Sequence, residues 1–168
     1  MTTRVESTVT YVPIAVEPWL KPWTQMGVAW GIVVVVLSLL AWGGQTVSWS
    51  APETAVRLGL TEAKDEVEPV YWADIRAEAL WDTFTLWTLL VAGILLILDA
   101  SVWTYFGLVG GAVYAYFGGR GVLARLEMQR RGLRIGTPSS VKAAYMFLPL
   151  WGVTGLITII AAAVALSS

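Results

Sequence analysis

Residues 83–119 read TFTLWTLLVAGILLILDASVWTYFGLVGGAVYAYFGG and contain one charged residue, Asp99. Uncharged runs of 16 and 20 residues lie before and after it. About 20 apolar residues in a helix cross the roughly 30 Å hydrocarbon core of a bilayer. The second run is long enough, whereas the first covers only about 24 Å. It must therefore begin earlier, let the Asp82 side chain reach back to the interface, or thin the bilayer locally. Because few residues separate the runs, we predict a tight helical hairpin of two membrane spans, about 80–98 and 101–119.

Two further uncharged stretches flank this hairpin. Residues 22–52 lie between Lys21 and Glu53, and no charged residue follows Lys142. We predict spans at about 26–46 and 139–166, which makes the chain an all-α, polytopic membrane protein with four transmembrane helices.

The remaining segments are expected to be short or extended. Prolines at 13, 18 and 22 suggest an extended N-terminal segment, 1–25, ahead of a single transmembrane domain, 26–168. The stretch Ser50–Glu53 has the spacing of a helix start and predicts a short interfacial helix, and a second amphipathic helix is expected from about residue 69. Thr137 followed by Pro138 predicts the start of the last helix.

The composition excludes several kinds of chemistry. Hydrophobic residues make up 57% of the chain and charged residues 14%, against about a quarter charged in a soluble domain. Cys, His and Asn are absent, which removes thiol nucleophiles, disulfides and the usual metal and haem ligands. We therefore expect no enzyme activity, no cofactor and no metal, and the net charge of −1 indicates no nucleic-acid partner. The Arg-rich, Lys-poor composition is compatible with a prokaryotic source.

The hairpin fixes the sidedness of the chain. Residues 48–82 and 119–142 must lie on one face of the membrane, and they hold nine of the eleven basic residues. The positive-inside bias then predicts a multi-pass protein of the cell membrane with both loops in the cytoplasm and both termini outside.

These two loops carry opposite charge. Residues 48–82 have a net charge of −5 and residues 119–142 a net charge of +5. The basic loop would bind an anionic leaflet, or dock on the acidic loop or on a partner. The residues proposed for this contact are Arg120, Arg125, Arg130, Arg131 and Arg134.

Small residues recur at four-residue spacing in the predicted spans. This pattern allows helices to approach closely in lipid. It predicts either packing within the bundle or a face for a second copy or another subunit. The helix-packing candidates are Gly27, Gly31, Gly107, Gly111, Ala115 and Gly119.

Four acidic residues are candidates for an ion or proton site. Asp99 is flanked by apolar spans, but Asp-Ala-Ser is also good turn chemistry. Asp74, Glu78 and Asp82 form a stripe of like charges, which solvent, Arg76, the basic loop or a divalent ion would offset. The ten tryptophans fit interfacial belts better than a cofactor groove.

These features favour a non-catalytic integral membrane subunit or scaffold. Its expected partners are membrane lipids and either further copies in a homo-oligomer or a larger membrane complex. The alternative is a small oligomeric cation channel or transporter that uses the acidic residues as a gate.

Overall fold

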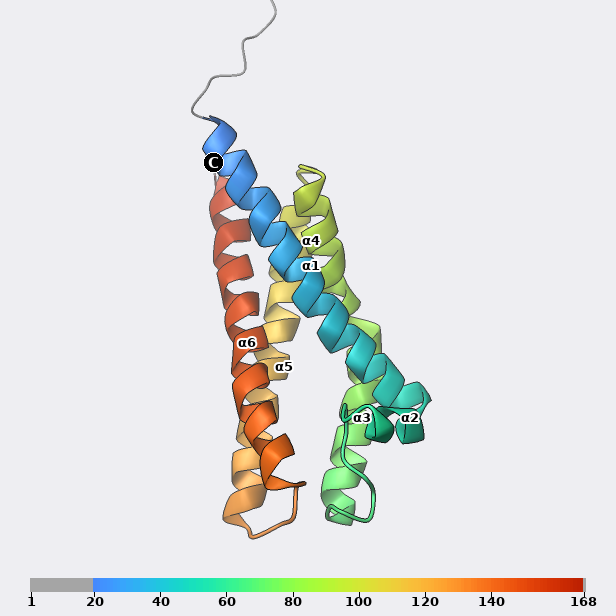
Figure 1. Cartoon of the computed structure of the whole chain (residues 1–168). Coiled ribbons are helices and arrows are strands. Elements are labelled where there is room, and N and C mark those ends of the chain that lie inside the picture. The colour runs from blue at the N-terminus through green and yellow to red at the C-terminus, as the bar shows by residue number, and fades with distance from the viewer. Residues whose placement is uncertain (1–19, 168) are drawn as a thin grey trace, which may run out of the picture.

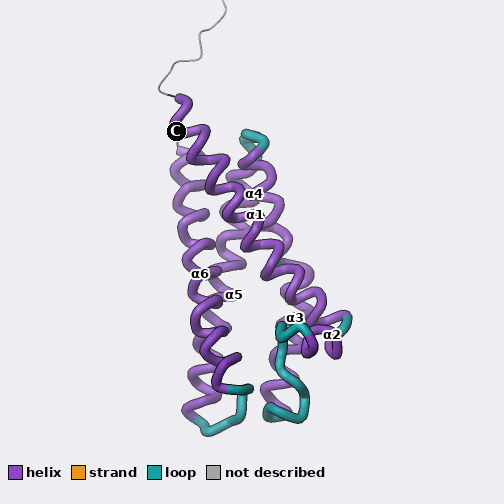
Figure 2. Tube along the Cα trace, viewed as in Figure 1, coloured by secondary structure: helices purple, strands orange, loops and turns teal. Residues whose placement is uncertain are grey.

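The computed structural model describes the backbone of residues 20–167 and the side chains of residues 25–167. Its regular structure over this range is entirely helical, as predicted, and Figure 2 shows the helices joined by short loops. The elements are α1 (Leu20–Ser50), α2 (Pro52–Arg57), α3 (Pro69–Thr85), α4 (Trp87–Ile97), α5 (Trp103–Arg130) and α6 (Pro138–Ser167).

The first helix begins earlier than expected. Residues 1–19 of the predicted extended segment 1–25 lie outside the described residues. The remaining part, from Leu20 onward, is helical and not extended. Pro22 is compatible with this start because amide groups in the first turn of a helix have no intrahelical partner to lose.

In the described part of the chain, three helices are long and apolar enough to cross a membrane, which indicates a membrane protein. They are Gln25–Ser50, Pro69–Ile97 and Pro138–Ser167. The second of these combines α3 and α4, interrupted only at Leu86, whose amide still donates to the carbonyl of Asp82 at 2.9 Å. The short apolar run after Asp82 therefore gains its length from the amphipathic helix before it.

The long helices alternate in direction (Figure 1). The described start of α1, the 98–102 turn and the end of α6 lie at one end of the molecule. The helix α2 and the loops 58–68 and 131–137 lie at the other end. The helix α4 contacts both α1 and α5, α5 packs along most of α6, and α1 continues down onto α3.

Glycines close the contacts between these helices at the level of the backbone. A Cβ on Gly110 would lie 2.6 Å from the amide nitrogen of Leu89, so α4 and α5 touch through main chain. A Cβ on Gly111 would lie 2.7 Å from the carbonyl oxygen of Gly155, so the same is true of α5 and α6. On the other side of the bundle, Gly31 faces Gly93 across α1 and α4. Such close approach lets van der Waals contact hold helices together where lipid supplies little hydrophobic drive.

The packing face of α5 differs from the predicted one. Gly107 and Gly111 are buried against α6, but no atom lies within 4 Å of a Cβ built on Gly119. Each four-residue step turns a helix by about 40° past a full turn. After three such steps the fourth residue of the repeat points about 120° away from the first, and no longer toward the same neighbouring helix. The contact continues instead through Gly118 and Gly121, which are buried against Leu148 and its neighbours.

Aromatic side chains add polar ties between helices. The indole nitrogen of Trp42 donates to the carbonyl of Thr83 at 2.9 Å, and that of Trp151 donates to the carbonyl of Leu37 at 3.0 Å. Both tryptophans are half-buried and join neighbouring helices through these hydrogen bonds. Tyr114 is fully buried and its hydroxyl lies 3.3 Å from the carbonyl of Ser38.

Candidate functional site

The loop end of the molecule contains a cluster of charged groups between α3 and α5. Asp74 and Glu78 are four residues apart on α3, so they share one face and lie together opposite α5. Arg120 bridges them, with one guanidinium nitrogen 2.5 Å from Asp74 Oδ1 and the other 2.7 Å from Glu78 Oε1. The acidic stripe is therefore offset by the basic loop and not by solvent alone.

The environment of Arg120 favours its charged form. The carboxylates of Glu78 and Asp74 lie within 2.7 Å of its guanidinium and offset the cost of its partial burial. The Glu78 side chain is 9% exposed and the Asp74 side chain 26% exposed, so the contact to Glu78 is the better shielded of the two. Charge-assisted hydrogen bonds in such surroundings are stronger than those in open water.

A second contact ties the loop after α5 to the start of α3. The Glu68 amide donates to the carbonyl of Arg134 at 2.9 Å, and the Arg134 Nε lies 3.3 Å from Glu68 Oε1. Beneath these bonds, a small apolar cluster is centred on Val67, Tyr71 and Ile135. The loops 58–68 and 131–137 are therefore joined by main-chain, ionic and apolar contacts together.

Arg76 does not take part in the acidic stripe. It lies two residues after Asp74, which turns it by about 200° to the other side of α3. There it donates to the carbonyls of Ser48 and Trp49, the latter at 2.8 Å. A cation at this position caps the last turn of α1 and interacts favourably with its dipole.

Asp82, the last member of the acidic stripe, is separate from the ion pairs. Its residue is 5% exposed, and Oδ2 has no hydrogen-bond partner among the described residues. Asp99 lies at the opposite end of the bundle, exposed in the turn between α4 and α5 with φ of +53°. Asp and Asn tolerate this left-handed conformation better than most residues, which fits the turn role of Asp99.

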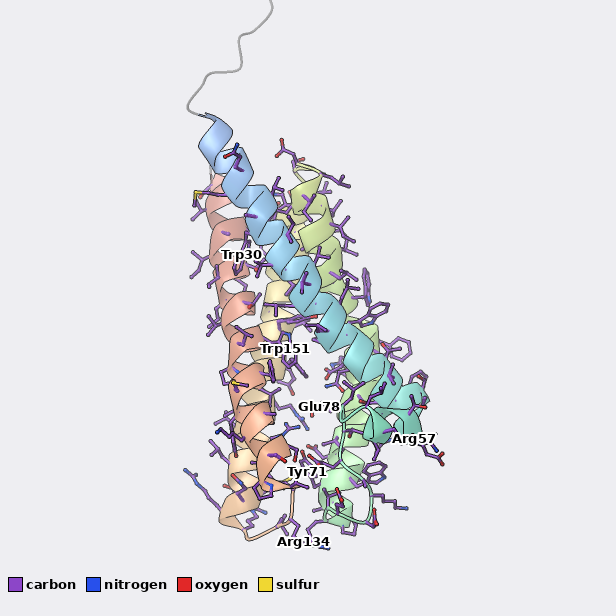
Figure 3. All side chains as sticks on the ribbon, viewed as in Figure 1. Trp30, Arg57, Tyr71, Glu78, Arg134 and Trp151 are labelled. Carbon is purple, nitrogen blue, oxygen red and sulfur yellow. The ribbon has the colours of Figure 1, made fainter. Side chains whose placement is uncertain are left out.

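A cleft of about 420 Å³ opens beside the charged cluster, between α1 and α3 on one side and α5 and α6 on the other. Figure 3 shows Trp151 toward the middle of the molecule, with Glu78 and Tyr71 nearer the loop end. The inner part is lined by apolar side chains, including Leu37, Leu148 and Trp151. The outer part is lined by polar ones, including Tyr71 and Arg125. The cleft is thus apolar at its inner end and polar at its mouth.

The predicted basic contacts divide into two groups. Arg120, Arg125 and Arg134 face α3, and the guanidinium carbon of Arg125 lies 5.7 Å from the centre of the Tyr71 ring. Arg130 is exposed, and Arg131 pairs with Glu127 on its own helix at 2.8 Å, with both side chains more than half exposed.

Most of the small residues predicted for helix packing contact a neighbouring helix of the same chain. Gly27 and Gly31 contact α4, and Gly107 and Gly111 contact α6, so the small-residue faces are used within the chain. Ala115 is half-buried beside Gly155. No group of three or more potential metal ligands occurs among the side chains from residue 25 to residue 167.

Several important residues were not singled out from the sequence. Tyr71, Glu68 and Glu62 gain their role from contacts with a loop more than 50 residues later. Their only sequence signal is the opposite charge of the two segments. Comparisons of the chain with protein-family models, curated proteins and solved structures found no match.

Proposed function

We propose that the protein is a non-catalytic integral membrane subunit or scaffold that associates laterally with further copies or with a larger membrane complex. In this proposal α1, α3–α4, α5 and α6 all cross the bilayer, and α2 lies at the interface. The length of α5 supports this proposal, because its 28 residues span about 42 Å and connect the end of one candidate span to the start of the next. The positive-inside bias supports a cytoplasmic position for the charged end and an external position for the termini.

The observation that carries this proposal is the close packing of α5 against α4 on one side and against α6 on another. Transport requires a polar path or helices that move apart. The contacts of Gly110 with Leu89 and of Gly111 with Gly155 leave no space for a side chain, and therefore none for a hydrated ion, at these positions. Close packing of α5 against α4 and against α6 is suited to a structural role.

The outward face of α1 offers a surface for lateral association. Ile32, Val36 and Leu40 follow one another at four-residue spacing and are exposed. Gly43 continues this side of the helix, and nothing lies within 4 Å of a Cβ built there. An apolar face that ends on an open glycine permits close approach of another helix in lipid.

The proposal is tested by extracting the full chain with its native lipids and measuring its mass by light scattering. We expect a stable homo-oligomer or co-migrating foreign polypeptides. Ile32→Cys and Val36→Cys should then form cross-links to the partner, whereas Val109→Cys, exposed on α5, should not. A lone monomer without cross-links from α1 would overturn the proposal.

A second candidate function is favoured by Asp82. A buried carboxylate with an unpartnered oxygen in a candidate span is the kind of group that binds a proton or cation in transporters. This alternative predicts cation flux in proteoliposomes that falls on Asp82→Asn and is unchanged on Asp99→Asn. No flux above protein-free vesicles would exclude it.

A further inference from the structure

The cleft beside the ion-pair cluster has the amphipathic character of a lipid molecule. Its inner wall combines Leu37 and Ala41 of α1 with Phe147, Leu148 and Trp151 of α6. Its mouth at the loop end is lined by Gln45, Tyr71, Arg125 and Ser140. Pockets of a few hundred cubic ångströms with apolar walls and a few convergent polar groups are typical ligand sites.

The charges at the mouth define what the head of such a ligand must be. Glu62, Glu78 and Arg125 line the cleft, and Glu78 is already paired with Arg120. Neither Glu62 nor Arg125 forms an ion pair with any described residue. The mouth therefore presents one carboxylate and one guanidinium without an ion-pair partner, which makes it complementary to a ligand that carries both signs.

These two groups are held in place by contacts that leave charge available. Arg125 donates to the carbonyl of Gly121 at 3.0 Å, hydrogen-bonds the Tyr71 side chain and lies over the Tyr71 ring. Its other N–H groups remain able to bind a phosphate, which the guanidinium fork matches well. The Glu62 carboxyl group lies directly against Gly136, where a Cβ would come within 2.5 Å of it.

The chemistry of the mouth favours a primary ammonium over a quaternary one. Quaternary ammonium groups are recognised by cages of aromatic rings. The aromatic ring at the mouth is that of Tyr71, and Arg125 lies over it. A primary ammonium instead donates hydrogen bonds and suits the Glu62 carboxylate.

We infer that the cleft binds one phospholipid with an ethanolamine headgroup. Its phosphate would contact Arg125, its ammonium Glu62, and part of its acyl chain the apolar wall between α1 and α6. This site goes beyond the proposed scaffold function, because it would exist in a monomer as well as in an assembly.

The inference is tested by native mass spectrometry of the full chain in detergent, titrated separately with dioleoyl phosphatidylethanolamine, phosphatidylcholine and phosphatidylglycerol. We expect one tightly bound phosphatidylethanolamine per chain, with an affinity about tenfold above that of the other two lipids. Arg125→Gln should weaken this binding about tenfold, and Arg130→Gln, which removes the same charge from an exposed site, should leave it unchanged. Glu62→Gln should abolish the preference for ethanolamine over choline.

A steric pair keeps the inference testable if a charge variant fails to fold. Gly44 lines the cleft and Gly119 does not, and a Cβ on either would meet nothing within 4 Å. Gly44→Leu should fill the cleft and reduce lipid binding, whereas Gly119→Leu should not. Equal binding of the three lipids, preference for phosphatidylglycerol, or equal effects of the two leucine variants would overturn the inference. The oligomeric state measured in parallel shows separately whether the scaffold proposal stands.

Discussion

Gly118 and Gly119 are neighbours on α5, yet alanine should change stability in opposite directions at the two positions. A Cβ on Gly118 would meet the backbone of α6, at 2.8 Å from the nitrogen and 2.9 Å from the Cα of Gly152, and closer still to the carbonyl oxygen of Leu148. Non-bonded carbon atoms prefer about 3.5 Å or more, so α5 and α6 would have to separate by roughly 0.6 Å. A Cβ on Gly119 meets no atom within 4 Å.

The magnitudes follow from these distances. Replacing glycine by alanine inside a helix stabilises it by about 1 kcal/mol. Gly119→Ala should therefore raise the free energy of unfolding by roughly 0.5–1 kcal/mol. Gly118→Ala gains the same contribution but incurs an overpacking cost of about 2–3 kcal/mol, because the atoms in the way are backbone and cannot rotate aside. Its net effect should be a loss of about 1–2 kcal/mol.

The assay is denaturant unfolding of each variant in mild detergent, followed by circular dichroism and by tryptophan fluorescence so that two-state behaviour is checked. Gly110→Ala, which would meet the backbone of Leu89, should behave like Gly118→Ala. If Gly118→Ala and Gly119→Ala shift stability in the same direction, the packing face assigned to α5 is wrong.

Three further predictions concern the loop end and the closure of the bundle. In a double-mutant cycle, Arg120→Gln and Glu78→Gln should show a coupling energy of about 1–2 kcal/mol, less than for a fully buried pair because Arg120 is one-third exposed. Trp151→Phe should lower the free energy of unfolding by about 1 kcal/mol through loss of the bond to the Leu37 carbonyl. Lys64→Cys and Ser139→Cys, both exposed, should react together with a membrane-impermeant reagent or be shielded together in intact cells.

Each of these measurements has an internal reference. The exposed pair between Arg131 and Glu127 should give a coupling of at most about 0.5 kcal/mol, and an equal value for Arg120 and Glu78 would contradict the role given to burial. Unchanged stability on Trp151→Phe would mean that its hydrogen bond does not hold α6 to α1. Labelling of one cysteine without the other would contradict a shared face for the two loops.

The charge pattern predicted which segments meet but not which residues. Opposite net charges on 48–82 and 119–142 make docking of the two loops one of three alternatives, beside binding to an anionic leaflet or to a partner, and the structure brings Arg120 to Asp74 and Glu78. The four-residue spacing of these carboxylates places them on one face, which sequence alone supplies. Whether Arg120 or Arg130 meets these carboxylates depends on the rotation and position of α5 relative to α3. Backbone contacts at Gly110 and Gly118 fix this position, and the charge pattern of the sequence does not reveal them.

Composition is a weaker guide to α5 than to the other long helices, for a physical reason. Apolar side chains mark a helix surface that faces lipid, but α5 lies against α4 on one side and α6 on another, and much of its surface meets protein. At those contacts glycine replaces larger apolar residues, as at Gly107, Gly111 and Gly118, because the neighbouring backbones leave no room for a side chain. Glycine at these contacts thereby lowers the apolar signal of α5. A search for long apolar runs alone underestimates the role of such a helix, whereas the short connections at both of its ends require it to return across the bundle.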